Sequence, residues 1–412
     1  MNSKVESGGH GLDEPGLIGE KMKKEKKMKK YFLIFVLAGI SFMGDFSSLA
    51  MAEMSEQEMR LRALEEKQQA NAQLLEILKR FSWYGNLRTR FQTESTETPG
   101  VTDERDRGRL RFRLGANVHM LKDLDIGFRM TTGGLTSRDG GNVTLDDGFS
   151  HKAFDLDQAF FRYQLTIAKW DAVLLGGKFL PTFMKSEIIW DDDVNVEGIG
   201  QQFSRKFGDT TLDANFGQFI YDEFDPGDDI IILGYQGILT QKTGLGKFRF
   251  AAAFYDVKNT EDVATTFSGT SLLSNTSEVR MLDLMGEWSE KVLGKELKLF
   301  GEYTRNIGDL ASGNEDLDTA WQVGAKYGKS GKKFGDYDLK VIYRLVQTEA
   351  VFDVISDSDF HDGRSNARGF EAGGSLGLSK GVKLAITYFD TQEERGTKRE
   401  NQKLQTDLIF SF

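Results

Sequence analysis

Alternation with a period of two dominates the chain from Trp83 to Phe412. Segments of about ten residues carry an apolar side chain at every second position, and the gaps between segments are alternately short and long. In one segment Leu110, Phe112, Leu114, Ala116, Val118 and Met120 alternate with Arg107, Arg109, Arg111, Arg113, Asn117 and His119. A membrane-spanning strand has about 9 to 11 residues, with one face toward lipid and the other toward a wet lumen. The pattern predicts an all-β fold, a transmembrane antiparallel barrel.

Sixteen segments fit this description. The predicted strands are 83–93, 107–119, 123–133, 156–165, 170–180, 199–206, 210–219, 230–240, 246–256, 279–289, 296–305, 319–328, 336–347, 368–378, 381–391 and 402–412. Strict alternation of turns and loops would place both termini on the periplasmic side. Pro99, Pro181 and Pro226 all fall in predicted long loops, as expected for a residue that cannot donate to a β ladder. A large soluble β-sandwich would explain neither this alternation nor a last strand that ends in Phe410 and Phe412, which resembles the assembly signal of outer-membrane barrels.

The N-terminus predicts export. Residues 21–30 are strongly basic, residues 31–43 are apolar, and Ala50, Met51 and Ala52 fit a signal-peptidase site, so residues 1–52 are expected to be a cleaved signal peptide. The apolar run is too short to span a bilayer. A start at Met28 would give a more ordinary signal peptide, which would make residues 1–27 a misassigned gene start. The expected location is the Gram-negative outer membrane.

Composition excludes several classes of function. The chain has no Cys, which removes disulfide frameworks and thiol chemistry, and its net charge of −10 argues against nucleic acid as a partner. Residues 373–377 match the G-x-S-x-G pattern, but they lie inside an alternating strand instead of a strand–turn–helix elbow. His119, His151 and His361 are far apart and show no metal-ligand spacing. We therefore expect no enzyme, no cofactor and no metal site.

Residues 53–81 differ from the rest and precede the predicted barrel domain, residues 82–412. A heptad assignment puts Met54, Leu61, Gln68 and Leu75 at position a and Gln57, Leu64, Asn71 and Leu78 at position d. This modest pattern predicts a periplasmic α-helix or coiled coil. Two hypotheses for this segment remain open. It is either a stalk, which trimerises the protein or tethers it to the cell wall, or a single amphipathic helix or plug near the barrel mouth.

Basic residues share the polar face of the first five strands. They are Arg88, Arg90, Arg107, Arg109, Arg111, Arg113, Arg129, Arg162 and Lys178. On the lipid face each Arg would cost roughly 2 to 4 kcal/mol at mid-membrane depth. Neighbours at i and i+2 in a wet lumen repel by only about 0.6 kcal/mol. We therefore expect these side chains to line the lumen, where they would favour anions.

The loop at 181–198 follows this part of the wall and has an apolar centre, Ile188, Ile189 and Trp190, which needs something to pack against. If the loop folds into the barrel, its acids would form a constriction opposite the arginines. These acids are Glu187, Asp191, Asp192, Asp193 and Glu197. The alternative is that the acids are solvated and the arginines only fill a wide lumen.

Two further loops are acidic. One carries Asp222, Glu223, Asp225, Asp228 and Asp229, and the other carries Asp353, Asp357, Asp359 and Asp362. Neither has the D-x-[DN]-x-[DN]-G spacing of a dedicated calcium loop. The favoured interpretation is solvated charge, or divalent bridging to lipid head groups.

A family resemblance rests on several short stretches. They are residues 144–150 (TLDDGFS), 156–159 (LDQA), 176–178 (GGK), 190–198 (WDDDVNVEG), 109–115 (RLRFRLG) and 127–133 (GFRMTTG). Together with a short helix between signal peptide and barrel, they resemble a bacterial putative porin family. The resemblance implies a porin-type channel and carries over no substrate. Val196 stands where the family typically has Pro, a departure within the loop motif.

These observations predict an outer-membrane porin, a passive and cofactor-free channel for small hydrophilic solutes and ions. The basic wall suggests anion preference. The expected partners are outer-membrane lipid or lipopolysaccharide, the barrel assembly machinery and two further copies of the chain in a homotrimer. The alternative from another class is a structural anchor that ties the outer membrane to the cell wall through the N-terminal helix.

Overall fold

The computed structural model describes residues 56–133, 140–223, 225, 227–260 and 279–412. The predicted signal peptide, residues 1–52, and Pro226 lie outside the described residues. The chain divides into two compact units, residues 1–78 and 79–412. Within the described ranges, no helix has both the length and the apolar character needed to cross a membrane.

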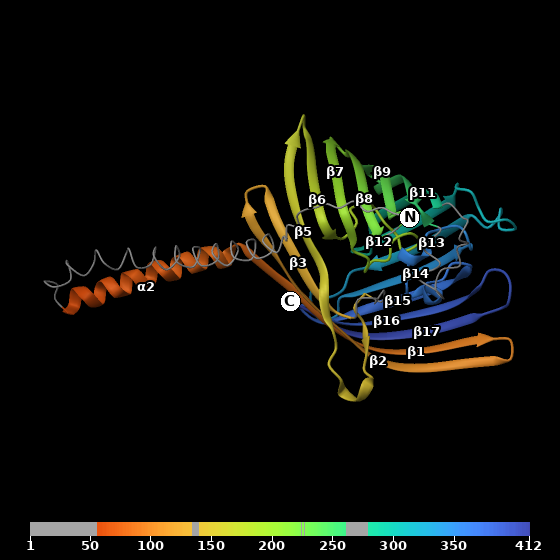
Figure 1. Ribbon diagram of the computed structural model, residues 1–412, viewed down its shortest axis with the longest axis horizontal. Coiled ribbons are helices and arrows are strands. Elements are labelled where there is room, and N and C mark those ends of the chain that lie inside the picture. Colours follow the sequence, from red (N-terminus) through yellow and green to blue (C-terminus); the bar gives the residue numbers. More distant parts are fainter. Residues whose placement is uncertain (1–55, 134–139, 224, 226, 261–278) are drawn as a thin grey trace, which may run out of the picture. The chain divides into compact units, whose positions relative to one another are not determined.

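The second unit is a closed antiparallel barrel (Figure 1), which confirms the predicted fold class. All sixteen predicted strands are present. They are β1 (Phe81–Thr98), β2 (Val101–Leu121), β3 (Leu124–Thr132), β5 (Phe154–Ile167), β6 (Trp170–Phe179), β7 (Val196–Phe207), β8 (Thr210–Asp222), β9 (Ile230–Thr243), β10 (Gly246–Lys258), β11 (Val279–Val292), β12 (Lys295–Asn306), β13 (Thr319–Gly328), β14 (Tyr337–Val346), β15 (Ala367–Ser379), β16 (Val382–Glu393) and β17 (Glu400–Ser411). The two-residue strand β4 (Val143–Thr144) pairs with β2 outside this series. Pairing of β1 with β17 closes the wall.

The connections define two ends of the barrel. The turn end carries the short connections 122–123, 168–169, 208–209, 244–245, 293–294, 329–336 and 380–381, and β1 begins and β17 ends there. The loop end carries the connections that join β1 to β2, β3 to β5, and so on around the wall. Outer-face residues such as Phe91, Leu284 and Val323 stay more than half exposed, as expected for a wall that faces lipid.

One predicted loop is wrong. Residues 94–106 were expected to form a long connection, but β1 and β2 continue to Thr98 and Val101 and are joined only by Pro99 and Gly100. Their backbones stay paired through polar positions such as Ser95 opposite Glu104. Two paired strands keep their backbone hydrogen bonds beyond the part of the wall where apolar and polar residues alternate. The end of this alternation in the sequence therefore does not mark the end of the strand.

The main hydrophobic core lies inside the barrel. The connections 180–195 and 347–366 turn inward, and their apolar residues pack against one another and against the inner wall. Trp190 is 1% exposed and its ring lies 5.8 to 6.1 Å from the rings of Phe183, Phe219 and Tyr255. The second connection contributes Ala350, Val351, Phe352, Val354 and Ile355. We call these connections inner loop 1 (residues 180–195) and inner loop 2 (residues 347–366).

The first unit contains α2 (Glu56–Lys79), within the range predicted to be helical. The apolar side chains of its predicted seam, including Leu61, Leu64, Leu75 and Leu78, are exposed. The formation of a coiled coil therefore stays a prediction.

Candidate functional site

Five arginines form a cluster on the inner face of β1 and β2. This arginine cluster comprises Arg88, Arg90, Arg109, Arg111 and Arg113, all at most 9% exposed. In each strand the residues are spaced by two, so they share a face. The register pairs Arg88 with Arg111 and Arg90 with Arg109, which brings the two strands' arginines onto the same side of the sheet.

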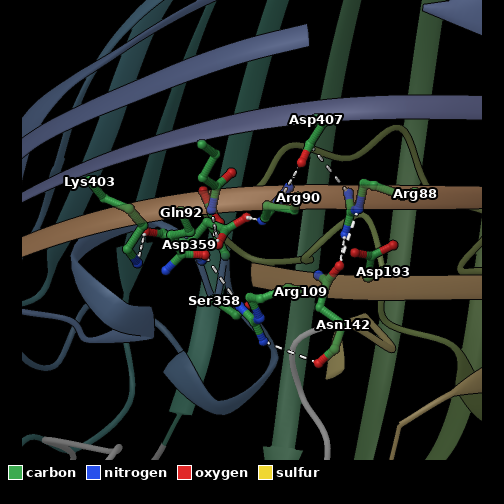
Figure 2. Close-up of polar contacts among 12 residues, drawn as sticks. Arg88, Arg90, Gln92, Arg109, Asn142, Asp193, Ser358, Asp359, Lys403 and Asp407 are labelled. Carbon is green, nitrogen blue, oxygen red and sulfur yellow. Dashed lines mark hydrogen bonds and ion pairs between the residues drawn. The ribbon is translucent and has the colours of Figure 1, made fainter. Parts of the chain in front are cut away.

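The β1 side of the cluster is held by carboxylate and amide oxygens (Figure 2). Arg90 donates to both carboxylate oxygens of Asp407, at 2.7 and 2.9 Å, and lies 3.5 Å from Asp359. Arg88 donates to Oδ1 of Asn142 at 2.6 Å. Burial opposes ionisation of Asp359, but the charges of Arg90 and Lys403 lower its pKa to about 2. Asp359 is therefore a fixed negative charge beside the cluster.

Inner loop 1 reaches the β2 side of the cluster through Asp193. Its carboxylate lies 2.9 Å from Nη2 of Arg113 and 3.3 Å from Nη1 of Arg111. Burial opposes ionisation here as well, but Arg113 and Arg111 lower the pKa of Asp193. The apolar centre of inner loop 1 packs in the core, and its Asp193 carboxylate therefore faces the guanidinium groups of Arg111 and Arg113 inside the barrel.

The other predicted basic residues are spread around the wall. Arg107 lies 2.8 Å from Glu94, and Arg129 donates to Asp157. Arg162 is exposed and lies opposite Asp125, nearer the turn end.

Two predicted positions are wrong, that of Lys178 on the basic pore wall and that of Glu197 in the constriction loop. They pair with each other across β6 and β7, on the opposite face from Phe179, whose side chain belongs to the interior core. The sequence interpretation assumed a uniformly polar interior, but inner loop 1 makes part of the interior apolar. Alternation alone therefore assigned the wrong face of β6. Glu197 also belongs to strand β7 and not to the loop.

The remaining predicted loop acids do not reach the arginine cluster. Asp191 accepts hydrogen bonds from the backbone and hydroxyl of Ser358. Asp192 is exposed and lies 3.1 Å from Lys185. Glu187 lies 3.6 Å from Arg344. Of the five predicted acids, only Asp193 faces the arginines.

Inner loop 2 is the element that sequence reasoning missed. Ser356 donates to the carbonyl of Ile188 at 2.7 Å, and the amide of Asp191 donates to the carbonyl of Ile355 at 2.8 Å, so the two inner loops form one body. On the wall side, Lys403 donates to Asp362 at 2.8 Å. The acids Asp353, Asp357, Asp359 and Asp362 therefore lie inside the barrel, which overturns their interpretation as solvated or lipid-bridging charges. The apolar residues 350–352 and 354–355 form a pattern in the sequence like that of Ile188–Trp190, which predicted packing for inner loop 1.

Three carboxylates converge where inner loop 1, inner loop 2 and β15 meet: Glu187, Asp357 and Glu371. Such a group could hold a cation. Here Arg344 fills the role, at 2.8 Å from Asp357, 3.6 Å from Glu187 and 3.7 Å from Glu371. Burial raises the pKa of Glu187, and the charges of Asp357 and Glu371 raise it further. The trio is a structural tie that uses a guanidinium group as its cation.

Open space remains beside the inner loops. A cavity of about 620 Å³ borders Asp155, Asp157, Trp190 and Asp193, and a smaller cleft of about 160 Å³ separates residues 184–187 from β11 to β14. A barrel of sixteen strands is wide enough for an aqueous channel. Charged side chains beside such space can select among solutes by charge and size.

A closed barrel with charged loops folded inside it defines the porin class of outer-membrane channel. Residues 86–285 and 275–412 match the model of the family described as "Putative porin", and the chain belongs to this family. Membership indicates a porin-like channel in the outer membrane and not an enzyme.

Solved structures share the fold at low sequence identity. The high-pH structure of Pseudomonas putida OprB is 11% identical, covers 82% of this chain and 96% of its own, and gives a TM-score of 0.52. Salmonella typhi OmpF in complex with daunomycin is 11% identical, with coverages of 81% and 97% and a TM-score of 0.48. A triple mutant of Rhodopseudomonas blastica porin is 10% identical, with coverages of 81% and 100% and a TM-score of 0.44. A comparison with curated proteins finds no match. The OprB likeness supports the barrel fold alone.

Proposed function

We propose that the chain forms a passive diffusion channel for small hydrophilic solutes and ions, with a preference for anions. The observation that carries this proposal is the arginine cluster facing Asp193 inside the barrel. Counter-ions within about 10 Å of a charged wall respond to that wall at 0.1 M salt, because more distant charges are screened. Local charge at the constriction therefore outweighs the net charge of −10 of the whole chain.

The charged groups on this part of the wall are mostly basic. Together with Arg129, the arginine cluster places six guanidinium groups on β1, β2 and β3, and the carboxylates of Asp157, Asp193, Asp359 and Asp407 form ion pairs with members of this group. The proposed anion preference depends on the field of these arginines at the cavity that Asp157 and Asp193 border. Because the arginines are nearly buried, they act on solutes through their field more than through direct contact.

Reversal potentials across planar bilayers in a KCl gradient test the proposal. Replacing Arg109, Arg111 and Arg113 together by Gln should lower the anion-to-cation permeability ratio several-fold. The matched control neutralises Arg60, Arg62 and Lys67, which are exposed on α2, and removes the same number of charges from residues that do not belong to the barrel wall. The control should keep the wild-type ratio.

Two outcomes would contradict the proposal. A full-length protein that folds in the bilayer and passes no current is not a diffusion channel. An unchanged reversal potential in the arginine variant would remove the arginine cluster from ion selection.

Assembly and orientation are part of the same proposal. We infer a signal peptide at residues 1–52, periplasmic termini and a homotrimer in the outer membrane. The short connections at the turn end, where β1 begins and β17 ends, support periplasmic termini. Phe410 of the closing strand β17 and Phe412, which follows this strand, support recognition by the barrel assembly machinery. Phe412 also exchanges backbone hydrogen bonds with Gly85 at the seam of the barrel.

The runner-up function is a structural anchor that acts through α2. The exposed apolar residues of α2 favour it, because such a helix gains stability from a partner. If removal of α2 abolishes attachment to the cell wall but leaves conductance unchanged, the result would support a separate anchoring role.

A further inference from the structure

Lysines follow one row of paired residues across the wall from β9 to β14. Lys242 pairs with Lys247, Lys247 with Ser289, and Ser289 with Lys298. Lys298 then pairs with Lys326, and Lys326 with Lys340. Directly paired residues share a face of the sheet, with about 4.5 to 5.5 Å between their Cβ atoms. We call Lys242, Lys247, Lys298, Lys326 and Lys340 the lysine row.

The lysine row faces the interior. Glu302 lies four residues from Lys298 in β12 and therefore on the same face, and its carboxylate accepts a hydrogen bond from Ser186 of inner loop 1. Arg344 lies four residues from Lys340 in β14 and contacts Asp357 of inner loop 2. The row thus lies on the same side of the wall as both inner loops.

The charge of the row is only partly compensated. Lys298 lies 2.8 Å from Glu287, and Lys340 pairs with Glu371. Among the described residues, no ion pair joins Lys242, Lys247 or Lys326 to a carboxylate. The ammonium group of Lys326 lies 5.6 Å from the ring centre of Phe300. Lys242 and Lys247 are direct neighbours and repel each other, whereas Lys326 lies three strands from Lys247, between Lys298 and Lys340.

The same row of pairs continues to Arg107, which lies two residues before Arg109 of the arginine cluster in β2. From Lys340 it passes through Gly373, Thr387, Gln405 and Gln92 to Arg107. Strands in a barrel are tilted, so a row of pairs climbs the wall. Lys340 lies three residues from the turn-end start of β14, whereas Gln92 lies eleven residues from the turn-end start of β1. The row thus has lysines near the turn end on β9 to β14, uncharged residues on β15 to β17 and β1, and Arg107 nearer the loop end on β2.

We propose that the lysine row is an anion-binding station for small solutes that carry a phosphate group or two carboxylates. The proposal rests on the diffusion channel proposed above and names its solute class. A single negative charge relieves repulsion at one ammonium group, whereas a divalent oxyanion can accept hydrogen bonds from two or three. Lysine suits this task because its ammonium is a point charge on a flexible stem, which adjusts to different oxyanions.

The small cleft between inner loop 1 and the wall gives such a solute a place. Four cations, Lys298, Lys326, Lys185 and Arg344, border its space of about 160 Å³, and so do four carboxylates, those of Glu187, Asp192, Glu287 and Glu302. Three of these cations already face a carboxylate, Lys298 on Glu287, Lys185 on Asp192 and Arg344 on Asp357. Lys326 is the one that an entering oxyanion would neutralise.

Block of chloride current by inorganic phosphate, added to the full-length protein in a planar bilayer, tests the proposal. Replacing Lys242, Lys247 and Lys326 by Gln should raise the half-blocking phosphate concentration at least tenfold. The matched control replaces Lys329, Lys332 and Lys333, which are exposed in the connection 329–336 at the same end of the barrel. That control should leave the half-blocking concentration within twofold of wild type.

The outcomes separate this inference from the channel itself. Absence of any current would defeat the proposed channel. Two results would overturn the lysine row as a binding station and leave the proposed channel intact. In the first, the protein conducts and prefers anions but phosphate does not block the current. In the second, phosphate blocks the lysine variant and its control equally. Block by succinate as well as phosphate supports the shared oxyanion class, and block by phosphate alone narrows it. If the triple variant fails to fold, K326Q alone keeps both ion pairs of the row and should raise the concentration at least threefold.

Discussion

Asp191 of inner loop 1 accepts two hydrogen bonds from Ser358 of inner loop 2, from its backbone amide at 2.9 Å and from its hydroxyl at 2.8 Å. Residues 167 positions apart in sequence thus join the two loops inside the barrel. The buried carboxylate also accepts from the amide of Asp193, the residue that faces the arginine cluster. The position of Asp193 therefore depends on the hydrogen bonds between Asp191 and Ser358 that join the two inner loops.

This joint predicts a pH dependence. Burial, and then the negative charge of Asp357, raises the pKa of Asp191 to about 7. An exposed Asp has a pKa of about 4, so the packed loops bind this proton more tightly than the open loops. The packing is most stable below about pH 4, weakens as the pH rises from about 4 to 7, and changes little above that. Fluctuations of single-channel current should therefore grow severalfold between about pH 5 and pH 8.

The substitution D191N checks the cause. Asn keeps an acceptor for Ser358 and cannot ionise, so the current fluctuations of the variant should be nearly independent of pH. A variant that keeps the wild-type pH profile would assign the effect to another group. D192N is the matched control, because Asp192 is exposed and bonded to Lys185.

Trp190 is predicted to hold inner loop 1 in place. Truncation of a fully buried Trp to Ala costs about 3 to 5 kcal/mol, here the packing against Phe183, Phe219 and Tyr255. The wall does not depend on this contact, since neighbouring strands pair its backbone. W190A should therefore keep heat-modifiable gel migration and show higher conductance. W83A, which removes an exposed Trp, is the control. Equal conductance of both variants would mean that the loop keeps its position without Trp190.

Arg344 is predicted to stabilise the folded protein strongly. R344Q would leave Glu187, Asp357 and Glu371 without their shared cation, and loss of one partner of a buried ion pair costs about 3 to 5 kcal/mol. The temperature at which the folded band disappears in heat-modifiable gels should fall clearly. Adding E187Q should restore part of the loss, because it removes one carboxyl group from the trio that has lost its cation. No recovery in the double variant would contradict the proposed charge balance.

Strand positions could be predicted because the wall imposes a local rule. Each strand must alternate, so Arg109, Arg111 and Arg113 revealed their face without any knowledge of their neighbours. The inward direction of inner loop 1 was also visible, in the apolar run Ile188–Trp190. Both signals come from residues close together in sequence.

The rest of the site depends on relations between distant residues. Asp359 meets Arg90 across more than 260 positions, and the lysine row appears only once the register of six strands is known. The error at Lys178 has the same origin, because the interior face of β6 is apolar only where inner loop 1 packs on it. Alternation identifies two faces of a strand and cannot say which face a distant loop will cover.

The last prediction concerns α2, whose exposed seam residues have no described partner contact. The barrel should fold without it, because the wall closes through β1 and β17 and the carbonyl of Arg80 at the start of β1 still accepts from His119. Deletion of residues 53–79 should leave conductance and heat-modifiable migration unchanged. If α2 sets the oligomeric state, the deletion should shift the protein from trimer to monomer in mild detergent, measured by light scattering, and changing Leu61, Leu64, Leu75 and Leu78 to Ser should do the same. A trimer that survives both changes would place the subunit contacts on the barrel wall and leave α2 as a tether.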